Sequence, residues 1–191
     1  MESKTVLQQY LAEQRAGLLS RLDGLGERDL RWPMTRTGTN LLGLVKHVAS
    51  VEAGYLGDVF GRPFGEPLPW LDEDAEVNAD MWAPPEQTSA EIIALHHRSA
   101  AHAEATIAAL DLDSPGDVPW WGPQHRHVTL HQILVHQIAE TARHAGHADI
   151  LRELIDGSAG DDRGNLADQS ADEWASYRRR LEAAAEAAAG S

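Results

Sequence analysis

The feature that most constrains this chain is the stretch from Val128 to Asp156, which reads as one long helix. Four polar side chains follow one another on it at spacings of four, four and three residues: His136, Glu140, His144 and His147. At about 100° per residue they fall within an arc of roughly 80°, one stripe of one helical face. Leu151 and Leu154 continue the stripe, which predicts that this face points at a core.

Imidazoles and a carboxylate that point inward are costly to desolvate unless something pairs with them. A divalent metal is the simplest single partner for all of them. Glu140 and His144 are one turn apart and can both reach one ion, with His47 or His136 as a third ligand. Three ligands leave positions open for water or substrate, which is typical of catalytic zinc and equally of non-haem iron. A buried histidine that hydrogen-bonds a glutamate on the next turn also gives this spacing without any metal, so both interpretations stand.

The rest of the chain predicts helices around this stretch. Apolar periodicity indicates a first helix at 3–22 and a second at 40–60, capped by Thr39 or Asn40, with His47 on its apolar side. Thr88 and Glu91 form a capping box before a third helix, 89–110. Thr129 caps the fourth helix, which Gly157 ends. With no convincing strand, the chain is expected to be an all-α four-helix bundle, which places metal and ligand sites among its facing helices.

The segments between these helices are long. Residues 27–37 read as a polar connector broken by a proline, and residues 61–87 hold five of the nine prolines with Trp70 and Trp82. A second loop, 111–127, contains Trp120 and Trp121. We expect one bundle domain, 1–157, followed at 158–191 by a linker and a C-terminal helix. The anchors of that tail helix are Trp174, Tyr177 and Leu181.

Composition excludes several classes of protein. The chain has no cysteine, which rules out disulfides, thiolate zinc sites and a cysteine nucleophile, so any thiol must come from a small molecule. Its formal net charge of -14 argues against nucleic acid as a partner, since phosphate binding needs a basic surface. No run of about 18 apolar residues predicts a membrane span. The amphipathic, charged N-terminus lacks an apolar signal region, which favours a cytoplasmic protein.

Two segments, LLGLVKHVASVE and WWGPQHRHVTLHQILVHQIAETARHAGHADILRELIDG, resemble the DinB/YfiT-like superfamily and its actinobacterial mini-circle branch. The resemblance covers residues 3–157 and extends to the tail. It implies a four-helix bundle in a down-up-up-down arrangement, with a divalent metal held by three side chains. Many relatives use three histidines; a glutamate at position 140 makes this chain similar to mycothiol-dependent maleylpyruvate isomerase and mycothiol S-transferases. When the metal-ligand positions of these relatives are transferred to this chain, the resemblance implies that the ligands are His47, Glu140 and His144.

The resemblance implies a metal-dependent S-transferase that uses mycothiol, activated as a metal-bound thiolate, against a small electrophile. Zinc is the expected ion, and iron, nickel or manganese suit the same ligands. One alternative is a non-haem iron oxygenase or thiol oxidase on these ligands; another is a non-enzymatic, stress-linked metal-binding bundle. Relatives are often dimers, so a homodimer is expected.

Five residues are expected to surround the proposed ion or bind the cofactor: His147, Asp149, Arg152, Trp120 and Trp121. Asp149 and Arg152 also suit an intrahelical ion pair, and the two tryptophans suit a cap on the bundle. His136 is expected to be a hydrogen-bond partner. The third helix carries His96, His97 and His102, which read as solvated or interface residues. His125, His127 and His131 read as surface histidines near the mouth of the site.

Overall fold

The computed structural model describes residues 2–160 and 166–190. It is mostly helical, which confirms the all-α class. The chain divides into two compact units, Met1–Gly160 and Asp161–Ser191, which are described separately. Part of the expected linker, residues 161–165, lies outside the described residues. Among the helices that the structure describes, none combines the length and apolar character needed to cross a membrane.

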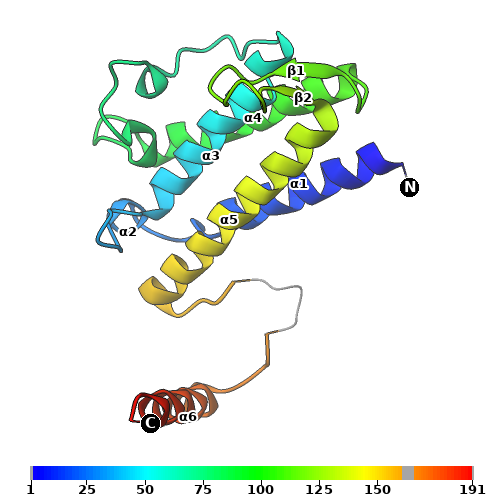
Figure 1. The fold of residues 1–191 in the computed structure, drawn as a ribbon. Coiled ribbons are helices and arrows are strands. Elements are labelled where there is room, and N and C mark those ends of the chain that lie inside the picture. The colour runs from blue at the N-terminus through cyan, green and yellow to red at the C-terminus, as the bar shows by residue number, and fades with distance from the viewer. Residues whose placement is uncertain (1, 161–165, 191) are drawn as a thin grey trace. The chain divides into compact units, whose positions relative to one another are not determined.

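Four long helices form the first unit (Figure 1). They are α1 (Ser3–Ser20), α3 (Leu41–Tyr55), α4 (Ser89–Ala109) and α5 (Leu130–Asp156). Helix α1 packs along α5, and α3 packs against both α4 and α5. Helix α3 therefore has a long neighbour on two sides, which brings its residues close to the polar stripe of α5.

Local capping explains where three of these helices begin. Asn40 accepts a hydrogen bond from the Gly43 amide at the start of α3, and Thr129 caps α5. At α4, the expected capping box of Thr88 and Glu91 is present in both directions. Gly157 ends α5 with a φ of 80°, a left-handed conformation that glycine adopts without strain. Helix α3 ends at Tyr55, five residues before the expected end at Phe60, and Asp58–Phe60 forms a separate 3-10 turn, η1.

The connecting segments contain more regular structure than the sequence indicated. The polar connector holds a short helix, α2 (Glu27–Arg31), and the crossover holds the 3-10 turns η2 (Pro69–Leu71) and η3 (Ala79–Met81). The expectation of no strand is wrong in the second loop, where β1 (Pro115–Asp117) pairs antiparallel with β2 (His127–Thr129). Such three-residue strands carry no alternating pattern, and this pair forms where the tryptophan loop folds back on itself.

The core of the first unit consists of two apolar clusters separated by polar residues. One cluster includes Leu18, Leu44, Val48, Ile92 and Leu151; the other includes Leu11, Leu56, Ile107, Leu130 and Ile133. On each long helix, buried polar residues come between the members of the two clusters. We call these residues the polar layer: Arg15, Glu52, His96, Ser99, Gln137 and Thr141. The layer is a structural feature of the core that the sequence did not reveal.

The second unit contains the expected tail helix, α6 (Ala171–Ala189). It begins with a capping box formed by Ser170 and Glu173, which fixes its first turn. Among the described residues of α6 none is buried, and Tyr177 and Leu181 are exposed. Trp174 is half-buried and packs against Tyr177, with 5.9 Å between the ring centroids, so these two expected anchors contact each other within this unit.

Candidate metal centre

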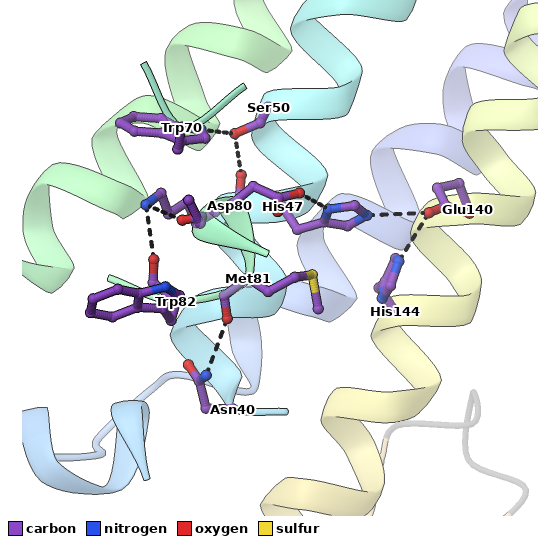
Figure 2. Close-up of polar contacts among 11 residues, drawn as sticks. Asn40, His47, Ser50, Trp70, Asp80, Met81, Trp82, Glu140 and His144 are labelled. Atoms are coloured by element: carbon purple, nitrogen blue, oxygen red, sulfur yellow. Dashed lines mark hydrogen bonds and ion pairs between the residues drawn. The ribbon is translucent and has the colours of Figure 1, made fainter. Parts of the chain in front are cut away.

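Helices α3 and α5 bring His47, Glu140 and His144 together (Figure 2). The Glu140 Oε1 atom lies 3.4 Å from His47 Nε2 and 3.0 Å from His144 Nε2. The two imidazole rings meet nearly edge to face, with 4.8 Å between their centroids. One ligand atom from each residue lies within 4.8 Å of the others. The three residues singled out in the sequence thus converge on one point.

This point lies at the edge of the α3–α5 contact. The buried residues of α5 include Leu134, Thr141 and Ala148. At 100° per residue, the middle of this buried face is rotated by roughly 75° about the helix axis from the middle of the polar stripe. Leu154 is 65 % exposed and His147 is also exposed, so the expectation that the whole stripe faces a core is wrong for these two. The flanking position leaves the cluster partly open to solvent.

Asp80 is a fourth member of the cluster that sequence reasoning missed. Its Oδ2 atom lies 2.6 Å from Nδ1 of His47, on the side of the ring opposite Glu140. Asp80 belongs to η3, in a crossover that holds seven acidic residues: Glu66, Asp72, Glu73, Asp74, Glu76, Asp80 and Glu86. Nothing in their spacing distinguishes one from another, because only the path of the crossover decides which of them reaches α3.

The first turns of α3 hold η3 in place. The Lys46 ammonium donates to the carbonyls of Ala79 and Trp82, at 2.8 Å each, and lies over the Trp70 ring. Burial lowers the pKa of Lys46 to about 8, while the nearby Asp80 carboxylate opposes that shift. Asn40, besides capping α3, donates to the Met81 carbonyl (Figure 2). One helix therefore carries His47 and also positions the carboxylate that contacts it.

Asp80 and Glu140 lie on either side of His47, and both carboxylates favour its protonated form. Burial alone would lower the pKa of His47, but Asp80 and Glu140 outweigh it and raise that pKa. The hydrogen bond with His47 lowers the pKa of Asp80. Burial works to raise the pKa of Glu140, but contacts with His144 and His47 bring it below its usual value. Both carboxylates are therefore ionised at neutral pH.

His144 has the opposite tendency. Burial and the neighbouring His47 lower its pKa, against the pull of Glu140. Its Nδ1 atom is buried and has no hydrogen-bond partner among the described residues. A neutral imidazole offers a nitrogen lone pair, which is the form that binds a metal.

The donor set and its spacing fit a divalent cation. Ligand atoms 2.0–2.1 Å from a tetrahedral zinc ion are roughly 3.3–3.4 Å apart. The separations of 3.4 and 3.0 Å from Glu140 to the two imidazole nitrogens are of this size. Two imidazoles with one carboxylate leave at least one coordination position for another molecule. In the described part of the chain, His47, Glu140 and His144 form a group whose side-chain types and mutual distances suit a metal ion.

A comparison with protein-family models finds the model described as mycothiol-S-transferase, matched by residues 6–157. The match runs from the first turn of α1 to the end of α5 and includes the whole cluster. The chain belongs to the mycothiol-S-transferase family. This confirms the family resemblance drawn from the sequence. No curated protein matches the chain, and the tail helix α6 lies outside the matched residues.

The tryptophan pair lies at the end of α3. The indole N–H groups of Trp120 and Trp121 both donate to the Tyr55 hydroxyl, at 3.0 and 2.9 Å. The rings of Tyr55 and Trp121 also pack against His136, one turn before Glu140. These contacts suit a cap over the end of the helix pair, and a contact with substrate stays a prediction. His136 lies within this aromatic group, where burial lowers its pKa against the effect of Glu140.

Two further predicted residues lie toward the C-terminal end of α5. Asp149 forms an ion pair with Arg21 at 2.9 Å. Arg152 pairs with Asp156 and donates to the Arg21 and Asp23 carbonyls. These contacts tie α5 to the end of α1, and a role in binding the cofactor stays a prediction. His147, by contrast, lies beside the cluster, with its ring centroid 5.4 Å from that of His144.

The remaining histidines divide into buried and surface residues. The interpretation of His96 as a solvated or interface residue is wrong: it is 1 % exposed, and neither ring nitrogen has a partner among the described residues. His102 contacts the Arg62 carbonyl, whereas His97, His125, His127 and His131 are exposed. An alanine-rich helix such as α4 gives little apolar contrast between its faces, so its buried face was assigned incorrectly.

Proposed function

We propose that this protein is a metal-dependent mycothiol S-transferase whose ion, zinc by preference, is held by His47, Glu140 and His144. The single observation that carries the proposal is the convergence of these side chains, with ligand atoms within 4.8 Å of one another. Membership of the mycothiol-S-transferase family supports the thiol. The absence of cysteine from the chain supports a nucleophile supplied by a small molecule.

A bound divalent cation supplies Lewis acidity, which lowers the pKa of a thiol in an open coordination position so that the thiol reacts near neutral pH. The chain's own residues prepare the site for it. Glu140, ionised at neutral pH, contributes negative charge, and His144 contributes a neutral nitrogen. The exposed His147, beside His144, is suited to accept the proton that the thiol releases.

The surroundings of the cluster support a small-molecule site. The three ligand side chains are 11–28 % exposed, enough for a thiol to reach them. Tyr55 and Trp121 pack against His136, one turn before Glu140, which places aromatic side chains near one end of the cluster. The packing of α1 on α5, and of α3 on α4 and α5, supports the four-helix bundle implied by the family resemblance.

The test is a metal analysis combined with a transfer assay. Protein purified without an affinity tag is analysed for metals, stripped with a chelator and reloaded with zinc. Each form is assayed with mycothiol and 1-chloro-2,4-dinitrobenzene. A carbon–sulfur bond forms, chloride leaves, and the thiol proton passes by way of His147 to solvent. We expect about one ion per chain and transfer that returns with zinc.

Glu140→Gln should lose the metal and lower kcat/KM by about 100-fold or more, because even residues behind a ligand contribute 10–100-fold. Glu153→Gln, an exposed site on the same helix, is the control and should behave like wild type. Transfer that is unaffected by stripping, or a protein that takes up no zinc, would overturn the proposal. If the protein instead contains iron and consumes oxygen only when a thiol is present, the thiol oxidase alternative replaces the proposed function.

A further inference from the structure

We propose that Asp80 is a positioning residue that fixes the tautomer and ring orientation of His47, so that the Nε2 lone pair points toward Glu140 and His144. The inference rests on the proposed function, because it takes His47 to be a metal ligand. It extends the site to a segment, η3, that lies in the crossover between α3 and α4.

The contact itself has the required chemistry. The 2.6 Å separation of His47 Nδ1 and Asp80 Oδ2 is that of a charge-assisted hydrogen bond. An imidazole that donates its Nδ1–H to a carboxylate leaves Nε2 as the nitrogen that binds a metal. Both side chains are 18 % exposed, so water competes little for the bond.

The position of Asp80 is itself fixed on both sides. The carbonyl of Ala79, just before it, accepts from Lys46, and the carbonyl of Met81, just after it, accepts from Asn40. Gly43 allows η3 to approach α3 closely, since a Cβ atom there would lie 1.8 Å from the Met81 oxygen. Figure 2 shows the contact of Asn40 with Met81 beside that of His47 with Asp80. Asp80 is therefore held against His47 by the helix that carries His47.

Of the two histidine ligands, only His47 receives this support from Asp80 among the described residues. The Nδ1 atom of His144 has no hydrogen-bond partner among the described residues, so the contact of Nε2 with Glu140 orients that ring without a carboxylate on its Nδ1 side. Loss of the Asp80 carboxylate should therefore alter His47 and leave His144 unchanged. This difference separates a positioning role from a general loosening of the site.

The first readout needs no metal. In metal-free protein with ¹⁵N-labelled histidine, at a pH high enough to deprotonate His47, ring NMR shifts report which nitrogen of the neutral ring carries the proton, and a His47→Gln spectrum assigns the signal. We expect the Nδ1–H tautomer in wild type and a shift toward Nε2–H in Asp80→Ala. Asp74→Ala, an exposed acid of the same crossover, should leave the tautomer of His47 unchanged.

The second readout is zinc affinity, measured by competition with a chromophoric chelator. Asp80→Ala should weaken zinc binding by about 10–100-fold, the range found for residues that support a metal-bound histidine. Asp74→Ala should bind like wild type. Asp80→Asn keeps the side-chain shape, serves if Asp80→Ala does not fold, and should weaken binding at least about tenfold.

The outcomes separate this inference from the proposed function. A wild-type tautomer and wild-type zinc affinity in both Asp80 variants, with zinc lost in Glu140→Gln, would overturn the positioning role alone. If wild-type protein binds no zinc, the proposed function fails. An unchanged His47 tautomer in Asp80→Ala would still overturn the positioning contact in that case.

Discussion

Two acids in this protein, Glu52 and Glu140, meet their positive partners in different ways. Glu52, in the polar layer, is 1 % exposed and binds the guanidinium of Arg15, with 2.7 Å between Arg15 Nε and Glu52 Oε1. Glu140, at the edge of the α3–α5 contact, is more open and binds two imidazoles. Burial raises the pKa of Glu52 even though Arg15 opposes that shift.

This contrast indicates that the Arg15–Glu52 pair is structural, whereas the cluster around Glu140 is suited to an exchangeable ion. A guanidinium is charged at every pH that the protein meets, so Arg15 supplies a permanent counter-charge to Glu52 from within the chain. Among the described residues, the ion-pair partners of Glu140 are histidines, whose charge depends on protons. A metal ion can take the place of those protons, whereas nothing can replace Arg15.

Removing the permanent cation should have the largest effect. Arg15→Met leaves the Glu52 carboxylate buried and unpaired, which should lower the free energy of unfolding by about 3–5 kcal/mol. Urea denaturation followed by circular dichroism measures this change. Arg98→Met removes a half-exposed ion pair with Glu66 and should cost less than about 1 kcal/mol. Equal effects of the two substitutions would contradict the structural role of Arg15.

The next largest effect is the pH dependence that His96 adds to the polar layer. Burial, with smaller contributions from Arg15 and His97, lowers the pKa of His96 from 6.5 to about 4. Between these values the folded protein binds fewer protons than the unfolded chain. This contribution to stability is fully present above pH 6.5, is lost as the pH falls toward 4, and amounts to about 3 kcal/mol.

Urea titrations of wild type and His96→Leu between pH 4 and pH 7 measure this contribution of His96 to stability. The stability of wild type relative to the variant should fall by about 3 kcal/mol between pH 7 and pH 4. His97→Gln, at the exposed neighbouring position, should change the slope only slightly, because His97 is the smallest of the three contributions to the lowered pKa of His96. Parallel curves for wild type and His96→Leu would show that His96 titrates normally in the folded state.

The smallest effect concerns the support of the metal centre. In Gly43→Ala the new Cβ atom would lie 1.8 Å from the Met81 oxygen, so η3 must move away from α3. We expect a loss of about 1–3 kcal/mol of stability from overpacking, together with weaker zinc binding. Gly54→Ala, on the same helix, meets only a Trp120 carbon at 3.7 Å and should cost nothing or gain up to about 1 kcal/mol.

Thermal unfolding and zinc titration of both glycine variants provide the measurement. Gly43→Ala should leave the Arg15–Glu52 pair intact, because that pair lies in the polar layer and not against η3. If the two variants are equally stable and bind zinc equally well, the close approach of η3 to α3 is not required for the centre.

Much of the helical framework could be predicted because its signals are local. The caps at Asn40, Thr88 and Thr129 depend on side chains that bond backbone groups three residues away. The ends of α4 and α5 therefore lie within a residue of those expected. The convergence of Glu140 and His144 also follows from one helical turn. His47 was added through the family resemblance as well as its place on an apolar helix face.

What the sequence could not supply depends on contacts between distant segments. Asp80 reaches His47 because Lys46 and Asn40 hold η3, and none of these contacts has a fixed spacing along the chain. The burial of His96, and the exposure of His147 and Leu154, depend on how far each helix is rotated toward its neighbours. Local signals in the sequence were enough to predict the four long helices and the types of ligand. The buried face of each helix and the carboxylate that supports the centre depend on tertiary packing, because both result from the summed interactions of the whole core.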